Sequence, residues 1–187
     1  MRVSFAGVVT HIVATAAVSI AYAISFYLVF WVSNWIQGHL AVNLIYGSVI
    51  FFPHGIRVIA AYLFGWWSLL YLLPISLFFA DPALGGFLHA KSIILALASP
   101  ASAVISFELL AKLGVIERQY LSASIHWKSL ILAGAVAAFF NAISHAALQV
   151  GKLRDWSAIA IGDVVGFLFV LIFAFALFKA HSFWVDR

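Results

Sequence analysis

Six hydrophobic stretches, separated by short polar connections, make up most of this chain. They lie near residues 8–33, 41–64, 66–80, 91–113, 127–149 and 157–179. Most of them reach the roughly 20 residues that an α-helix needs to cross the hydrocarbon core of a bilayer, although the third is short. The pattern predicts an all-α, polytopic membrane protein, with six transmembrane helices bundled into one integral membrane domain over residues 1–187.

Helix breakers interrupt the second stretch, within "FFPHGIRVIAAYLFGWW" at residues 51–67. Pro53 cannot donate a backbone hydrogen bond and Gly55 weakens the following turn, so we expect the second helix to be kinked or broken there. A break frees backbone groups, which a membrane tolerates only where protein or water satisfies them. Broken membrane helices often form binding sites for this reason.

Two polar side chains directly after the break indicate what such a site would bind. If a new helical piece begins around His54, its positive N-terminal end and the Arg57 guanidinium together favour an anion, such as a carboxylate or a phosphate. The alternative is a structural kink, in which Arg57 bonds to nearby carbonyl oxygens. The residues leave both interpretations open.

Composition limits the class of protein. Hydrophobic residues make up 66% and charged residues 9% of the chain, so a soluble globule of this size could not hide its apolar surface from water. The short connections leave no room on this chain for a soluble catalytic or DNA-binding domain, and we expect any output to pass through a partner protein or across the membrane. A net charge of +4 is small for a nucleic-acid binder, and the absence of cysteine excludes thiol chemistry and disulfides.

The distribution of basic residues predicts the orientation in the membrane. With a cytoplasmic N-terminus, the inner side would carry Arg2, Lys112, Arg118, Lys128, Lys179 and Arg187, and the outer side Lys91, Lys152 and Arg154. Basic residues concentrate on the cytoplasmic side of membrane proteins, so we predict that both termini are cytoplasmic.

Polar side chains inside the predicted spans point to a second group of candidate residues. Ionisable groups there are expensive, and by default they mark a site, a pair or a water-filled cavity. Counting along the predicted helices places Asn43, His145 and Asp163 within roughly 6 Å of one level, near the outer side. Asn141 and His145 also continue a stripe of small residues at helical spacing, which should face protein. These residues are predicted to converge on an outward-facing pocket, or else to bond between helices, with Asp163 accepting from His145 or a backbone amide.

Arg57 has one further possible partner inside the membrane. Glu108 lies at a similar predicted depth, so a buried ion pair between them is one option, whereas the other pairs Glu108 with Lys112, one helical turn away. The predicted ligand-binding residues are His54, Arg57, Asn141, His145 and Asp163, with Pro53 and Gly55 as the structural break.

Catalytic and cofactor motifs are missing from the sequence. Haem needs two imidazoles at one depth, but His54 and His145 are predicted to differ by about 12 Å along the membrane normal. No HExxH metal motif and no GxSxG nucleophile elbow occurs. We therefore expect no haem, no metal ion, no other cofactor and no enzymatic activity.

Two stretches resemble MASE1-type bacterial integral membrane sensory domains. "FFPHGIRVIAAYLFGWW", followed by "SLLYLLPISLFFA", is similar to their repeated P-x-G-I and L-x-G-W pattern, with matches at Pro53, Gly55, Ile56, Gly65 and Trp66. "WSAIAIGDVVGFLFVLIFAF" is similar to their final W…GD…G-x-L helix, with matches at Trp156, Gly162, Asp163 and Gly166. The resemblance implies a stand-alone, shortened sensory module in the bacterial inner membrane that acts through a signalling partner, since those domains have about eight helices and are often fused to an output domain.

Two other functions fit the same pattern. Six helices with cytoplasmic ends and an outward polar cluster also look like the substrate-binding membrane subunit of a vitamin importer, where an alanine-rich first helix, here with Ala17 and Ala21, would dock a shared partner. The third possibility is a structural or accessory subunit of a larger membrane complex, in which the polar groups only lock the helices together.

Overall fold

The computed structural model describes residues 5–40, 48, 50–79, 89–117 and 126–185, and this part of the chain contains helices and no strand. The helices are α1 (Phe5–Leu40), α2 (Phe52–Phe64), α3 (Trp67–Phe78), α4 (Ala90–Lys112), α5 (Trp127–Ala147) and α6 (Leu153–Val185). The all-helical prediction is confirmed for the described residues.

Four of these helices, α1, α4, α5 and α6, are long and apolar enough to cross a membrane. The helices α2 and α3 have 13 and 12 residues. At 1.5 Å per residue each is about 20 Å long or less, which is short of a hydrocarbon core of about 30 Å. The structure is therefore compatible with membrane insertion, while the predicted count of six spans is not confirmed.

Local signals explain where several helices begin and end. Gly114 follows α4 with a φ of 68°, and the Val115 N–H donates to the carbonyl of Leu110 at 2.9 Å. This arrangement is a Schellman cap. It favours glycine because the residue at this position has a left-handed backbone conformation, which glycine adopts without strain. At the start of α6, a carboxylate oxygen of Asp155 accepts from the Lys152 N–H at 2.8 Å, which is half of a capping box.

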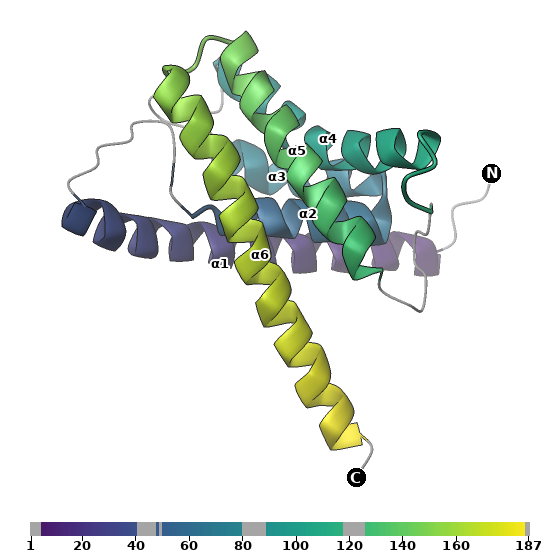
Figure 1. Cartoon of the computed structure of the whole chain (residues 1–187). Coiled ribbons are helices and arrows are strands. Elements are labelled where there is room, and N and C mark those ends of the chain that lie inside the picture. Colours follow the sequence, from purple (N-terminus) through teal and green to yellow (C-terminus); the bar gives the residue numbers. More distant parts are fainter. Residues whose placement is uncertain (1–4, 41–47, 49, 80–88, 118–125, 186–187) are drawn as a thin grey trace.

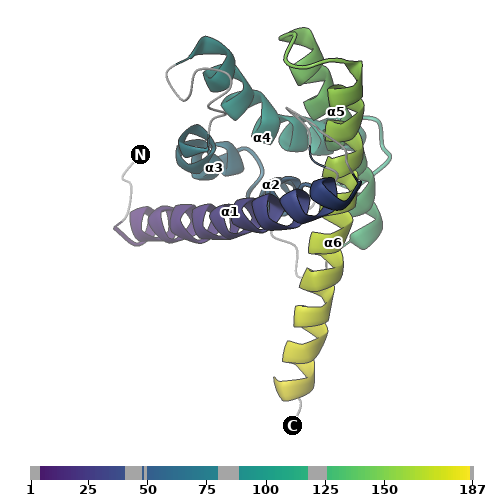
Figure 2. The ribbon, with the colours of Figure 1, turned by 90° about the vertical axis from the view of Figure 1, so that its left-hand side faces the viewer.

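The short helix α2 lies at the centre of the molecule and packs against each of the other five helices. On one side α1 contacts α2 and α3, and on the other α4 packs on α5 and α5 on α6. Figures 1 and 2 both show α1 running across α6 instead of alongside it. The helices thus form crossed layers around α2, where the sequence pattern predicted a bundle of aligned spans.

The C-terminal end of α6 extends away from the other helices (Figures 1 and 2). Large apolar side chains along the second half of this helix are exposed, among them Ile172, Phe173 and Leu177. A helix that is apolar on all sides suits a lipid environment.

Buried apolar residues form two clusters, one on each side of α2. Val58 and Ala61 belong to the cluster shared with α4, α5 and α6, whereas Ala60 belongs to the cluster shared with α1 and α3. Small residues permit the close contacts: a Cβ added to Gly134 on α5 would lie 2.2 Å from the ring of Phe167 on α6. In a membrane such close backbone approach is a main source of helix association.

The start of α2 explains the helix breakers in the sequence. Phe51 is not helical, with φ −124° and ψ 84°, and Pro53 occupies the first turn of the helix that follows. Proline suits this position because the first N–H groups of a helix have no intrahelical partner. The predicted kink inside a longer helix is not confirmed, because α2 begins at Phe52 and residues 41–47 lie outside the described part.

Helix α6 accommodates the non-helical residue, Phe51, that precedes α2. The Phe51 N–H donates to the carbonyl of Gly162 at 2.8 Å. One turn later, a Cβ on Gly166 would lie 2.3 Å from the carbonyl carbon and oxygen of Phe51. The two glycines, four residues apart, therefore hold a non-helical backbone segment, and protein groups satisfy a backbone N–H that lipid could not.

Candidate functional site

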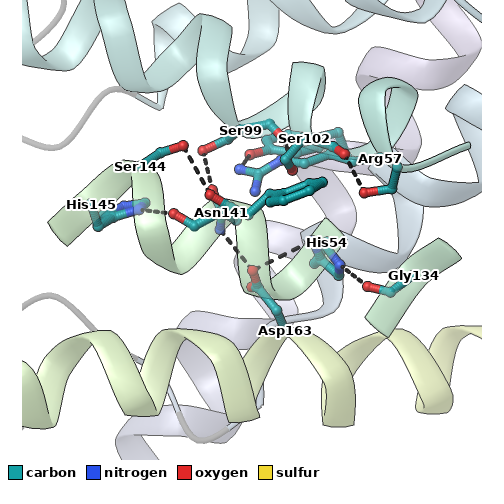
Figure 3. Close-up of polar contacts among 12 residues, drawn as sticks. His54, Arg57, Ser99, Ser102, Gly134, Asn141, Ser144, His145 and Asp163 are labelled. Atoms are coloured by element: carbon teal, nitrogen blue, oxygen red, sulfur yellow. Dashed lines mark hydrogen bonds and ion pairs between the residues drawn. The ribbon is translucent and has the colours of Figure 1, made fainter. Parts of the chain in front are cut away.

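A buried polar network connects four helices next to the start of α2 (Figure 3). The Ser99 hydroxyl of α4 donates to Asn141 Oδ1 of α5 at 2.7 Å. The Asn141 amide then donates from Nδ2 to Asp163 Oδ2 of α6 at 2.7 Å. His54 of α2 completes the network, with Nδ1 3.4 Å from the same carboxylate oxygen.

Asp163 is the acceptor on which this network converges. Its side chain is 1% exposed, and it directly follows Gly162, the residue that bonds to Phe51. The Asn141 amide has a fixed orientation, because its oxygen accepts from Ser99 and its nitrogen must therefore face the carboxylate. A buried carboxylate needs such donors, since leaving it without them costs several kcal/mol (about 3 to 5 on loss of a buried partner).

His54 joins the carboxylate to the backbone of α5. The ring is completely buried, and Nε2 lies 3.1 Å from the carbonyl oxygen of Gly134. The Phe167 ring contacts the imidazole edge to face, with centroids 6.3 Å apart. His54 therefore contacts polar groups of α5 and α6 from a position at the first turn of α2.

Arg57 lies one turn further along α2 and has different surroundings. The side chain is only 6% exposed, and Nη2 donates to the Tyr22 hydroxyl of α1 at 2.6 Å. The guanidinium carbon is 5.4 Å from the ring centroids of both Tyr22 and Phe51, which is cation–π distance. Among the described residues, no group accepts a hydrogen bond from Nε or Nη1.

The two unsatisfied nitrogens set Arg57 apart from the rest of the site. A buried donor without a partner costs about 1 to 3 kcal/mol, and more when it is charged. Within the described part of the chain, Arg57 donates to the Tyr22 hydroxyl and bonds neither to the carbonyl oxygens near the break nor to Glu108. It is thus a buried cation with donors to spare.

The structure joins three of the five predicted site residues directly. His54, Asn141 and Asp163 contact one another through the carboxylate, whereas Arg57 lies on the same helix as His54 and bonds to α1. His145 lies one turn beyond Asn141, with Nδ1 3.0 Å from the Asn141 carbonyl, and Figure 3 shows it away from Asp163. Asn43 lies outside the described residues.

Sequence reasoning missed three groups that complete the site. Ser99 belongs to a stripe with Ser102 and Ser106 on α4, and this stripe was the available signal for a polar face. Tyr22 and the Gly134 carbonyl carry no signal in the sequence, since an aromatic residue and a helix carbonyl are ordinary features of any membrane helix.

The arrangement has two chemical capacities. Arg57 offers hydrogen-bond donors and a positive charge to an anion, and the His54 and Asp163 pair has nitrogen and oxygen atoms that can share a proton. In the described part of the chain, no three histidine, aspartate or glutamate side chains gather as a metal ion would require.

Comparison with models of known protein families, with curated proteins and with solved structures gave no match to this chain. The geometry of its own residues is therefore the basis for a functional assignment.

Proposed function

We propose that this chain is a membrane-embedded, MASE1-like sensory module that binds a small anionic ligand at Arg57 and acts through a partner protein. It would reside in the bacterial inner membrane with both termini in the cytoplasm, and it would carry no catalytic activity and no cofactor of its own. The observation that supports this proposal is a buried guanidinium with two donor nitrogens that no described residue satisfies, in a chain with only 9% charged residues.

The central position of α2 supports a role in signalling. Arg57 and His54 lie on α2, which contacts each of the other described helices. A ligand that bonds to Arg57 would act on α1 through Tyr22 and on α6 through Phe51. Ligand occupancy could therefore change how α1 and α6 pack on α2, which is the kind of change that a partner protein can detect.

A second function, a structural subunit of a larger membrane complex, is favoured by a different observation. Ser99, Asn141 and Asp163 satisfy one another by direct hydrogen bonds, and such a closed network can serve simply to fix the helices relative to one another. In that case Arg57 alone would lack a role. The importer subunit has no comparable support. Ala17, the residue that would dock its partner, is exposed, but a residue that faces lipid would be exposed as well.

Native mass spectrometry of the full chain in mild detergent distinguishes these functions. We expect a retained small molecule on the wild-type protein and its loss in Arg57→Gln, with retention in the control Ser157→Ala, an exposed position on α6. A ligand-free chain bound in fixed ratio to other membrane proteins would support the structural subunit instead.

A further inference from the structure

We propose that the anion enters together with one proton, which the His54 and Asp163 pair takes up. This inference rests on the ligand-binding function proposed above and adds the charge state of the site and the class of ligand. Three observations carry it: the surroundings of the His54 ring, the charges of the buried groups, and the aromatic residues around Arg57.

Both ring nitrogens of His54 face hydrogen-bond acceptors. Nε2 faces the Gly134 carbonyl oxygen at 3.1 Å, and Nδ1 faces Asp163 Oδ2 at 3.4 Å. A carbonyl oxygen only accepts, so Nε2 must carry a proton to bond with it. The contact on the other side then needs a second proton, either on Nδ1 or on the carboxyl group of Asp163.

The second proton is not firmly held. A strong charge-assisted hydrogen bond between an imidazolium and a carboxylate measures about 2.7 to 2.9 Å. The observed 3.4 Å is longer, and Nδ1 does not meet the geometry of a hydrogen bond. Meanwhile Asn141 already donates to Oδ2, which stabilises the carboxylate when the proton is absent. The pair can therefore gain or lose one proton without losing its other contacts.

Charge balance links this proton to the anion. Arg57 is positively charged at all accessible pH values. When the pair lacks its second proton, Asp163 is negative and offsets Arg57. When the pair holds it, the pair is neutral and Arg57 is left as an uncompensated charge in an apolar interior, which is costly. A bound monoanion removes that cost, so anion and proton are expected to enter together.

Other titratable groups on the helices around α2 compete with the pair as proton acceptors. The buried ones are Tyr22 on α1, Tyr71 on α3, Glu108 on α4 and Asp155 on α6. Two partly buried histidines also lie on these helices: His11 on α1 contacts the Tyr71 hydroxyl, and His145 on α5 contacts the Asn141 carbonyl. Tyrosine ionises only at high pH. The remaining buried carboxyl groups are Glu108 and Asp155, the latter accepting from the Lys152 N–H at the start of α6. The variant Asp163→Asn below distinguishes both from Asp163, and Glu108 is also replaced directly.

Aromatic rings define the class of anion. Besides Tyr22 and Phe51, which flank the guanidinium, Phe26 and Phe79 stack on each other with centroids 4.2 Å apart and both contact Tyr22. A guanidinium among rings is suited to a planar carboxylate that carries an apolar body, because the head can pair with Nε and Nη1 while the body contacts the rings.

Isothermal titration of the full chain in nanodiscs tests the inference, with benzoate as the probe and uncharged benzamide as its matched control. The two buffers bis-Tris and Tris have different ionisation enthalpies, so the difference in binding heat between them at one pH gives the number of protons taken up. We expect benzoate to bind with uptake of about one proton, and therefore up to about tenfold more tightly for each unit of pH decrease. Benzamide should not bind.

Three variants show which residue takes up the proton and distinguish the proton uptake from the anion binding at Arg57. Asp163→Asn should still bind benzoate but take up no proton, whereas Glu108→Gln should keep the uptake, and Arg57→Gln should lose binding altogether. Because the buffer comparison on the wild-type protein needs no variant, a misfolded Asp163→Asn leaves the test intact.

Two other outcomes are possible, and they differ in whether anion binding at Arg57 stands. Benzoate binding without proton uptake, or uptake that disappears in Glu108→Gln, overturns the inference and leaves anion binding at Arg57 in place. Absence of benzoate binding from about pH 5.5 to about pH 8, the range in which histidine changes charge, overturns the inference and the proposed binding function together.

Discussion

The contact between Gly166 and the backbone of Phe51 makes a sharp prediction about the fold. In Gly166→Ala, the added Cβ would lie 2.3 Å from the carbonyl carbon and oxygen of Phe51 and 2.6 Å from its nitrogen. Carbon atoms pack without strain at about 3.5 Å or more. Since all three atoms belong to the backbone, no rotation of a side chain can relieve the overlap.

Two effects set the expected loss of stability. Phe51 must shift by about 1 Å to restore ordinary contact, which strains the packing at a cost of about 1 to 3 kcal/mol. The same shift weakens the 2.8 Å hydrogen bond from Phe51 to Gly162, and a buried unsatisfied N–H costs about 1 to 3 kcal/mol. Alanine regains at most about 1 kcal/mol through helix propensity. We therefore expect a net loss of about 2 to 4 kcal/mol.

Unfolding of the purified protein by SDS, followed by circular dichroism, measures this loss. Ala176→Val is the control, because it adds carbon atoms to α6 at an exposed position. If Gly166→Ala unfolds at the same SDS fraction as this control, Phe51 does not pack against α6 as described. Phe51→Ala should not rescue Gly166→Ala, since the overlap is with the backbone.

Three further perturbations follow from the same contacts. Gly134→Ala should destabilise the protein, because the added Cβ would lie only 2.2 Å from the Phe167 ring. The double variant with Phe167→Ala should lose at least about 1 kcal/mol less stability than the sum of the two single changes. Strict additivity in SDS unfolding would contradict the contact. Tyr22→Phe removes the hydroxyl oxygen 2.6 Å from Arg57 and should lower the free energy of unfolding by about 1.5 to 3 kcal/mol. The same change should cost almost nothing when Arg57 is already methionine, and equal losses with and without Arg57→Met in thermal melts would disprove the bond. Asp163→Leu should lower the free energy of unfolding by about 3 to 5 kcal/mol, because it leaves buried donors without their acceptor. Asp163→Asn should lose less, and equal melting temperatures of the two variants would show that the carboxylate is not part of the network.

Hydropathy located the helices because run length and polar interruptions are local properties. The structure has α4 at Ala90–Lys112 and α5 at Trp127–Ala147, close to the predicted stretches at 91–113 and 127–149. Pro53 likewise marked the start of α2 within a residue or two, since proline favours the first turn of a helix. Hydropathy carries no information on direction, however, and the crossing of α1 over α6 was not predicted (Figure 2).

The site was predictable as a set of residues and not as a set of contacts. Asp163, Asn141 and His54 stood out because polar groups are rare and costly inside apolar helices. The sequence predicted His145 or a backbone amide as the donor to Asp163 for interhelical bonding, and His145 is the wrong donor. Asn141 and His145 lie one turn apart on the same face of α5, so spacing alone does not distinguish them. The packing of α5 on α6 decided it, and Asn141 forms the bond while His145 contacts its own helix.

Composition and hydropathy alone indicate a chain apolar enough for a membrane, the approximate positions of its helices, and the polar side chains that need an explanation. Three features depend on the packing of distant segments: Gly162 and Gly166 hold the non-helical Phe51, His54 bonds to a carbonyl 80 residues away, and two Arg57 nitrogens find no acceptor among the described residues. The reason is physical: helix formation depends on neighbouring residues, whereas these contacts depend on how closely helices from distant parts of the chain approach one another.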